Sequence, residues 1–320
     1  MTNGLKSALG IVPIIAGFIL LAANWSPSPA QAPNLQEARA GHKTVLTQQL
    51  RYSNPAPTPP SELLKLVKYP SPAGNLAAYV TPDPGDGKKR PAILWLTGGF
   101  GNGIGSTAWK KANPANDQSA SVFREFGIVM MYPSLRGGSG NPGQAESFYG
   151  EVDDVLAAAR YLAAQPYVDP KRIYLGGHST GGTLALLVAE STDLFRAVFS
   201  FGPVAEAADY GAKSLTFDVG NAQENRLRSP LYYLGAIRST TFIVEGSDKP
   251  SNLGSIRQFK QRKPPPVITF VEVPNTSHFS VLAPMNRLLA QKIAKDTGVE
   301  PNIKIIDAEA SDAVNNTPAR

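Results

Sequence analysis

Short apolar runs alternate with amphipathic stretches over most of the chain. Apolar runs of strand length occupy residues 92–96, 172–175, 197–201, 241–244 and 267–273. The segment 149–166 differs, because its apolar residues recur every three or four positions, as on one face of a helix. This alternation predicts a single α/β domain over residues 62–299, with a mostly parallel central sheet flanked by helices. At 320 residues and 42% hydrophobic content, the chain is long enough for one such core.

The two ends of the chain have a different character. Residues 1–30 hold Lys6, an apolar run from 8 to 23 and then small residues, a pattern typical of a secretory signal. The run is short for a membrane span, which needs about 20 residues, so an uncleaved N-terminal membrane anchor is the alternative. We therefore expect an exported protein, periplasmic or secreted. Residues 31–61 are predicted to be a proline-rich linker or arm, and residues 300–320 a C-terminal tail that frays after Ala313.

A serine between glycines lies where an apolar strand runs into an apolar helix. The stretch is Gly177-His178-Ser179-Thr180-Gly181, between residues 172–175 and 183–189. Such a turn needs backbone angles that side chains resist, so small residues flank the serine, and the geometry lifts its hydroxyl clear of the sheet. This pattern predicts Ser179 as a nucleophile.

A serine hydroxyl needs an imidazole nearby to accept its proton, and the chain has three histidines. In a strand-turn-helix nucleophile arrangement the order along the chain is serine, acid, histidine. His42 precedes the serine, and His178 occupies the variable position of the turn itself. The prediction for the base is therefore His278, which follows the apolar strand 267–273.

The acid that orients this imidazole should lie between Ser179 and His278, at the end of another core strand. Asp248 follows the apolar run 241–244 closely and is the predicted orienting acid. The other candidates are Glu245, held in reserve, and the weaker Asp209 and Asp218.

Donors are also needed for the negative charge that develops on a carbonyl oxygen during acyl transfer. One should be the backbone N–H of Thr180, directly after the nucleophile. The second should come from the loop after strand 92–96, which reads Thr97-Gly98-Gly99-Phe100-Gly101. Either Gly99 or Phe100 would supply it. This oxyanion hole completes the predicted catalytic site.

Other motifs in the chain carry weaker signals. Residues 103–108 match a loose dinucleotide fingerprint, but they begin several residues past the strand. Residues 176–183 resemble a phosphate-binding loop in which Gly182 replaces the necessary lysine. The acids at 151, 153 and 154 are interpreted as the solvated first turn of a helix, with no histidine nearby to help bind a metal. We therefore expect no cofactor and no metal.

From about residue 62 to 296, the chain resembles the prolyl-oligopeptidase-like branch of the α/β-hydrolase superfamily, which includes serine peptidases and esterases. The resemblance is spread over several motifs. These are Leu96-Thr97-Gly98-Gly99, Tyr132-Pro133-Ser134-Leu135-Arg136-Gly137-Gly138, Glu151-Val152-Asp153-Asp154, 168–173, the serine turn with Gly182, Arg228-Ser229-Pro230-Leu231, Gly246-Ser247-Asp248 and Ser277-His278-Phe279. It implies the α/β-hydrolase fold, a triad of Ser179, Asp248 and His278, and an Arg136-Gly137 loop near the mouth of the active site.

The expected function is that of a serine hydrolase with an acyl-enzyme intermediate. Peptidases of this branch carry a β-propeller before the catalytic domain, and the roughly 60 residues that precede the domain in this chain are too few for one. A carboxylesterase acting on small or exposed esters is therefore favoured. The alternatives are a peptidase acting on short peptides, with Glu206 and Asp209 gripping the substrate ammonium, and a non-catalytic binding protein of the same fold.

The segment between strands 197–201 and 241–244 is longer than a simple crossover, which predicts a small cap over the substrate pocket. Its aromatic residues are the candidates for lining that pocket, with core packing as the alternative; they are Tyr210, Phe217, Tyr232 and Tyr233. The net charge is +6, and the short basic clusters at 88–90 and 260–263 lack interleaved aromatic residues, so we expect no nucleic-acid partner. The absence of cysteine excludes disulfides and lipid attachment through a cysteine.

Overall fold

A central sheet of eight strands organises the fold, in the order β1-β2-β4-β3-β5-β6-β7-β8. The computed structural model describes residues 1–2, 33–110 and 112–317. The chain divides into two units, Met1–Gln31 and Ala32–Arg320, and the sheet belongs to the second. The strands are β1 (Lys65–Ser71), β2 (Gly74–Val80), β3 (Arg90–Leu96), β4 (Val129–Pro133), β5 (Val168–His178), β6 (Ala197–Phe201), β7 (Thr240–Asp248) and β8 (Ile268–Ser277). β2 pairs antiparallel with β1 and β4, and every other pair is parallel, which confirms the predicted fold class.

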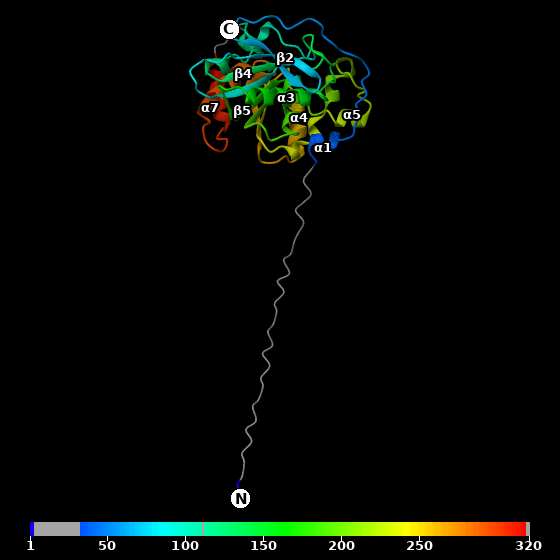
Figure 1. The fold of residues 1–320 in the computed structure, drawn as a ribbon, viewed down its shortest axis with the longest axis vertical. Helices are drawn as coiled ribbons and strands as arrows, with labels where there is room; N and C mark the ends of the chain where they lie inside the picture. The colour runs from blue at the N-terminus through cyan, green and yellow to red at the C-terminus, as the bar shows by residue number, and fades with distance from the viewer. Residues whose placement is uncertain (3–32, 111, 318–320) are drawn as a thin grey trace. The chain divides into compact units, whose positions relative to one another are not determined.

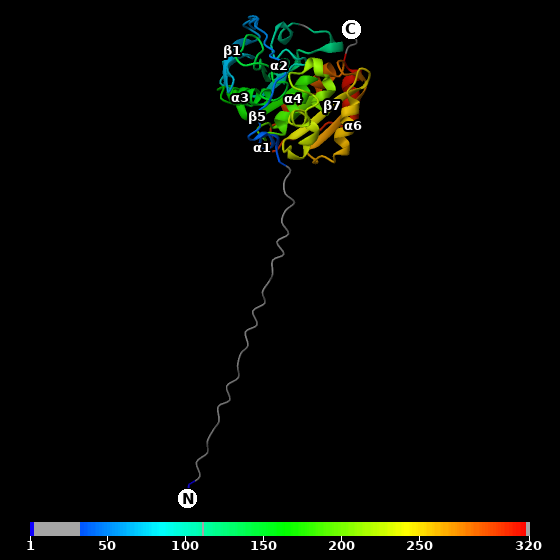
Figure 2. The same ribbon diagram turned by 90° about the vertical axis from the view of Figure 1, so that its right-hand side faces the viewer.

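Helices connect the parallel strands and cover the sheet (Figure 1). The α-helices are α1 (Leu35–Arg39), α2 (Val122–Glu125), α3 (Glu151–Ala163), α4 (Thr180–Ala189), α5 (Ala222–Arg226), α6 (Leu253–Gln261), α7 (Leu282–Lys295) and α8 (Asp307–Asn315). Short 3₁₀ turns are η1 (Ser106–Ala108), η2 (Pro114–Asn116), η3 (Ala207–Tyr210), η4 (Ala212–Ser214), η5 (Pro230–Tyr232) and η6 (Leu234–Ala236). Figure 2 shows β1 and β7 towards opposite sides of the unit, as the strand order requires.

The side chains of β3 show that the sheet is buried on both faces. Ala92, Leu94 and Leu96 belong to one apolar cluster together with residues of α3 and α4. Ile93 and Trp95, which point to the opposite face, belong to a second cluster together with residues of α2 and α7. Side chains of a strand alternate between faces, so a continuous apolar run is what a strand between two helical layers requires.

Two of the three acids at the start of α3 are buried, which corrects the sequence interpretation for them, whereas Asp153 is exposed. Glu151 is 2% exposed and Asp154 is fully buried. Asp154 accepts hydrogen bonds from the backbone N–H of Arg136 at 2.9 Å and from its guanidinium at 2.9 and 3.0 Å. The guanidinium also pairs with Glu146 at 2.8 Å. A buried carboxylate needs such a partner, and this one fixes the loop after β4 against α3.

The segments at either end of the domain lie against it. We call residues 42–57 the arm; it follows α1 and hydrogen-bonds to loops distant in the sequence. At the other end Ile303 and Ile305 are buried, and Lys292 of α7 pairs with Glu309 of α8 at 2.6 Å. Helix α8 runs to Asn315, beyond the point where fraying was expected.

The predicted signal segment lies almost entirely outside the described residues. In the part of the chain that the structure describes, no helix is both long and apolar enough to cross a membrane.

Candidate active site

The backbone at Ser179 is strained, as the sequence pattern predicts. Strand β5 ends at His178 and helix α4 begins at Thr180, with φ 56° and ψ −116° at the serine between them. A non-glycine residue in this region costs energy and persists only where its surroundings enforce it. Here the enforcement is close packing: a Cβ on Gly181 would lie 2.1 Å from the carbonyl oxygen of Leu96. The side chain of Ser179 is partly exposed at the carboxyl end of the sheet.

The imidazole of His278 is held by a buried carboxylate. His278 follows β8, and its Nδ1 lies 3.1 Å from Oε2 of Glu245, which is fully buried at the end of the core part of β7. The backbone N–H of His278 donates to the carbonyl of Pro250 at 2.7 Å. The ring is therefore fixed through both its side chain and its backbone, as a positioned general base should be.

Gly202 connects this pair to the nucleophile. A Cβ at Gly202 would lie 2.4 Å from the His278 ring and 2.6 Å from Glu245 Oε2, so only glycine fits there. The preceding residue, Phe201, accepts a hydrogen bond from the backbone N–H of Ser179 at 2.8 Å. The serine, the histidine and the carboxylate thus lie at the carboxyl ends of adjacent strands. Within the described ranges, no hydrogen bond joins the Ser179 hydroxyl to the His278 ring.

Asp248 does not occupy the position predicted for it, and this is a correction. Its side chain is exposed and accepts a hydrogen bond from the Ser247 hydroxyl at 3.1 Å. The reason is the length of β7, which continues through Asp248 with an irregular register between Gly246 and Asp248. The extra strand residues carry Asp248 past the imidazole, and the reserve candidate Glu245 takes the contact.

The predicted oxyanion loop lies beside the nucleophile. A Cβ on Gly98 would be 3.3 Å from the Cβ of Ser179, and the hydroxyl of Thr180 donates to the carbonyl of Gly99 at 2.8 Å. Gly99 has φ 102°, which favours glycine. Because Thr180 begins α4, its N–H has no partner within the helix. Thr180, Gly99 and Phe100 all line a cavity of about 470 Å³.

Of the four aromatic residues predicted to shape the pocket, the structure places Tyr210 beside Ser179. Its hydroxyl hydrogen-bonds to the hydroxyl of Thr183 at 2.8 Å, and burial raises the pKa of its phenol. Its ring packs edge-on against the ring of Phe100, with the centroids 5.3 Å apart, and stacks with the ring of Phe148, with the centroids 5.7 Å apart. Tyr210 thus forms an aromatic floor next to the nucleophile.

The other three aromatic residues lie elsewhere, which corrects the prediction. Phe217 is 1% exposed, with the guanidinium of Arg228 4.5 Å from its ring centroid. Tyr233 is buried in the main apolar cluster. Tyr232 lies in a separate surface hollow, under the guanidinium of Arg226. Each is explained by packing, the alternative that the sequence left open.

His178 has a role that the sequence did not indicate. Its Nε2 donates to the backbone carbonyl of His278 at 2.9 Å, and Gln118 Nε2 donates to its Nδ1 at 2.9 Å. The two imidazole rings are 4.5 Å apart. Burial, and then the charge of His278, lower the pKa of His178 to about 3, so the ring stays neutral at ordinary pH. The one signal in the sequence was an imidazole in an apolar strand directly before the nucleophile.

In the part of the chain that the structure describes, no group of three or more histidine, aspartate or glutamate residues is arranged so that it could hold a metal ion.

Comparison with known proteins finds one family match and several similar structures. The model of the Prolyl oligopeptidase family matches residues 114–244. A puromycin-hydrolyzing peptidase of Mycobacterium tuberculosis has a similar structure, with a TM-score of 0.60 and 20% identity over 77% of this chain and 42% of its own. An acylaminoacyl peptidase in complex with Z-Gly-Gly-Phe-chloromethyl ketone is also similar, with a TM-score of 0.55 and 16% identity over 77% of this chain and 43% of its own. The chain thus spans less than half the length of these two peptidases.

An esterase from Pyrobaculum calidifontis is also similar, with a TM-score of 0.53 and 17% identity over 74% of this chain and 86% of its own. No curated protein sequence matches the chain. The family match agrees with the eight-stranded sheet and with the strained serine at the end of β5. The chain thus matches the Prolyl oligopeptidase family over residues 114–244, and its fold is similar to the folds of these peptidases and of this esterase.

Proposed function

We propose that the chain is a serine hydrolase that works through Ser179, His278 and Glu245 and forms an acyl-enzyme. The observation that carries the proposal is the convergence of a strained, partly exposed serine with a histidine held by a buried carboxylate 3.1 Å away. The three residues lie far apart in the sequence and meet at one edge of the sheet. Strain and buried charge are both costly, and their coincidence is typical of an active site.

The reaction follows from the position of each group. The Ser179 oxygen attacks the substrate carbonyl, while His278 Nε2 takes the serine proton. Glu245 holds Nδ1–H and stabilises the imidazolium that forms. The N–H of Thr180, together with that of Gly99 or Phe100, receives the negative charge on the carbonyl oxygen. His278 then protonates the leaving group, and water releases the acyl group by the same steps in reverse order.

The hydrogen bond between Ser179 and His278 forms when substrate binds. Catalytic hydrogen bonds of this kind are often long in the free enzyme and shorten in the Michaelis complex. The substrate carbonyl would draw the serine hydroxyl towards the imidazole.

A carboxylesterase is the form of this activity that we propose. The chain spans 86% of the Pyrobaculum calidifontis esterase but only 42% of the puromycin-hydrolyzing peptidase. The similarity to this esterase therefore extends over most of the esterase's own length, which favours an esterase as the first candidate. We propose small or exposed esters as its substrates.

A peptidase acting on short peptides is the second candidate. The observation that favours it is a pair of acids, Glu206 and Asp209, on the same short segment as Tyr210. Partial burial raises the pKa of Asp209, and the charge of Glu206 raises it further, so a substrate ammonium would be attracted to the pair. Glu206 already accepts a hydrogen bond from Asn225 at 2.7 Å, which weakens this candidate.

A fluorophosphonate probe tests the proposed class of enzyme. We expect the purified protein to be labelled on Ser179, and the Ser179→Ala variant to remain unlabelled. No labelling of the folded protein, or labelling that survives the substitution, would favour the non-catalytic binding protein. A panel of p-nitrophenyl esters beside aminoacyl p-nitroanilides then separates esterase from peptidase.

We also propose that residues 1–30 direct export. The supporting observation is their pattern of a lysine, an apolar run and small residues. Fractionation of expressing cells, with N-terminal sequencing of the product, tests this. An intact N-terminus in the membrane fraction would indicate the anchor instead.

A further inference from the structure

The arm, residues 42–57, is tied to the catalytic domain along its length. Backbone hydrogen bonds of 2.7 to 2.9 Å attach it to two loops, the one between β4 and α3 and the one between β6 and β7. They join Thr47 N to Thr216 O, Ala145 N to Leu50 O, Tyr52 N to Gly137 O and Gly140 N to Tyr52 O. Leu46 also forms an isolated β-bridge with Phe217. The arm is therefore a fixed part of the domain surface, although it has no strand or helix of its own.

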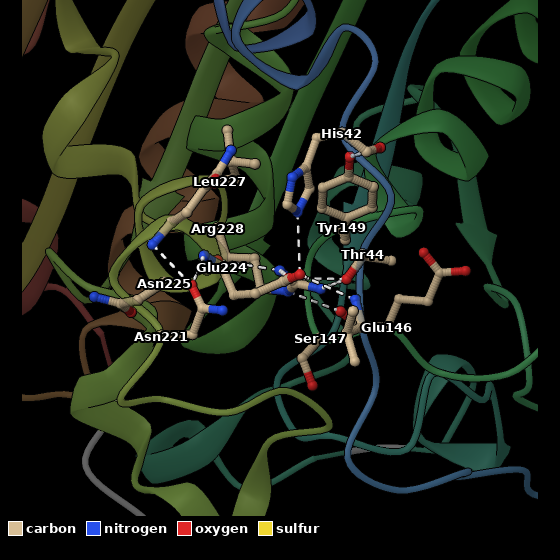
Figure 3. Close-up of polar contacts among 12 residues, drawn as sticks. His42, Thr44, Glu146, Ser147, Tyr149, Asn221, Glu224, Asn225, Leu227 and Arg228 are labelled. Atoms are coloured by element: carbon tan, nitrogen blue, oxygen red, sulfur yellow. Dashed lines mark hydrogen bonds and ion pairs between the residues drawn. The ribbon is translucent and has the colours of Figure 1, made fainter.

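A buried ionic cluster fastens the first part of the arm (Figure 3). Glu224 of α5 accepts hydrogen bonds from His42 Nε2 at 3.0 Å, from the Thr44 hydroxyl at 2.8 Å and from the backbone N–H of Val45 at 2.9 Å. Arg228, which is fully buried, pairs with the same carboxylate and donates to the carbonyl of Glu146 at 3.1 Å. These bonds lower the pKa of Glu224 to about 2, against the effect of its burial. The cluster thus joins the arm to the loop that carries Ser147 and Phe148.

The later part of the arm forms a wall of the cavity beside the nucleophile. Four of its residues with apolar surface line that cavity; they are Leu50, Tyr52, Pro55 and Pro57. The other walls include Phe100 of the oxyanion loop, Phe148 and Leu184. Tyr79 of β2 donates from its hydroxyl to the carbonyl of Pro57 at 2.6 Å, which fixes the end of this wall.

The position of the cavity indicates which part of a substrate would enter it. His278 must hand its proton to the leaving group, so the leaving group lies on the histidine side of the scissile bond. The cavity is lined by the oxyanion loop and by Thr180, which directly follows Ser179, whereas neither Ser179 nor His278 is among its lining residues in the described part of the chain. It therefore lies on the oxyanion side of the serine, away from His278, which is the side of the acyl group.

The chemistry of the lining indicates the class of acyl group. In the described ranges, no lysine, arginine or histidine lines the cavity, and Glu151 is its one acidic residue. Glu151 is 2% exposed, and its Oε1 accepts hydrogen bonds from Asn102 at 2.9 Å and from the backbone N–H of Glu146 at 2.6 Å, so it presents little surface to the cavity. An anionic acyl group would find no cation, whereas apolar atoms would find leucine, proline and phenylalanine surfaces.

We propose that the arm is the outer wall of an acyl pocket and sets the length of the uncharged, mainly apolar acyl group that the enzyme accepts. The inference rests on the proposed serine hydrolase function. It assigns to residues 50–57 a control over substrate size that is independent of the triad.

Chain-length profiles of Leu50 variants test the proposal. kcat/KM is measured for p-nitrophenyl esters from acetate to decanoate, and for a succinate monoester as the anionic case. In the unaltered protein, each methylene that enters apolar contact should raise kcat/KM by roughly fourfold until the pocket is full. The succinate monoester should react more slowly than the uncharged ester of equal length.

The variants should move the preferred chain length in opposite directions. Leu50→Ala removes part of the wall, so the optimum should shift to longer chains. Leu50→Trp fills the pocket, so it should shift to shorter ones. Leu66→Ala, which truncates an exposed leucine on β1 that does not line the cavity, is the matched control and should keep the original optimum.

Two results would contradict different parts of the proposal. An optimum that stays the same in both Leu50 variants, or shifts equally in Leu66→Ala, overturns the role of the arm while leaving the hydrolase function intact. Absence of hydrolysis of every ester, together with absence of fluorophosphonate labelling, overturns the proposed function itself and the acyl pocket with it.

Discussion

Replacing Glu245 by glutamine tests the assignment of the orienting acid. Its carboxylate lies 3.1 Å from His278 Nδ1, and no arginine or lysine pairs with it among the described residues. At an effective dielectric constant of about 20, the attraction between an imidazolium and this carboxylate is about 5 kcal/mol. The glutamine amide keeps the shape and loses the charge, so most of this stabilisation disappears from the transition state. We expect kcat to fall by about 10³ to 10⁴.

The assay is steady-state hydrolysis of p-nitrophenyl acetate, with thermal unfolding as a check that the variant is folded. Asp248→Asn is the matched control, because it removes a carboxylate three residues away on the same strand. Since Asp248 is exposed and does not contact His278, its replacement should change kcat by about twofold at most. A large loss in Asp248→Asn with near-normal activity in Glu245→Gln would refute the assignment and restore the original prediction.

Three further outcomes follow from buried polar groups. His178→Phe removes the donor to the His278 carbonyl, so kcat should fall roughly tenfold to a hundredfold with KM unchanged. His178→Gln should recover part of the lost kcat. A change in KM alone would contradict a positioning role for His178. Glu190 is fully buried, neither of its carboxyl oxygens has a hydrogen-bond partner, and burial raises its pKa well above 4.5. Its protonated form is therefore favoured by folding, and the free energy of unfolding in urea should decrease from pH 5 to pH 7 by up to about 1.4 kcal/mol per pH unit relative to Glu190→Gln; parallel curves would disprove this. Arg228→Met leaves Glu224 buried without its cation and should lower the free energy of unfolding in urea by about 3 to 5 kcal/mol. The double variant with Glu224→Gln should recover part of this loss. A loss below about 1 kcal/mol would show that water or the arm compensates for the missing cation.

Local signals were sufficient to predict that Ser179 and His278, the proposed nucleophile and base, lie at the ends of strands. The glycines around Ser179 and the apolar strands before Ser179 and His278 are properties of neighbouring residues, and the structure places both side chains at strand ends. The orienting acid is different, because Glu245 and Asp248 are three positions apart on one strand. The choice depends on how far β7 extends and on its irregular pairing with β8, which are consequences of tertiary packing.

The substrate side of the site was predicted less well for a related reason. An aromatic residue in a long insertion has the same sequence signature whether it packs against cavity-lining residues, as Tyr210 does against Phe100 and Phe148, or fills the core, as Phe217 does. The role of His178 likewise depends on a carbonyl one hundred positions away. The cavity wall contributed by Leu50 could not be foreseen, because a proline-rich polar segment carries no periodicity that marks a contact surface.

The attachment of residues 42–57 to loops near position 220 has a consequence for biogenesis. This stretch leaves the ribosome before the sheet exists, yet its anchoring partners Thr216, Glu224 and Arg228 are synthesised some 170 residues later. It must remain unseated until most of the polypeptide has emerged. The site beside Ser179 is thus completed late, so a nascent molecule lacks the finished pocket even where its serine turn has already formed.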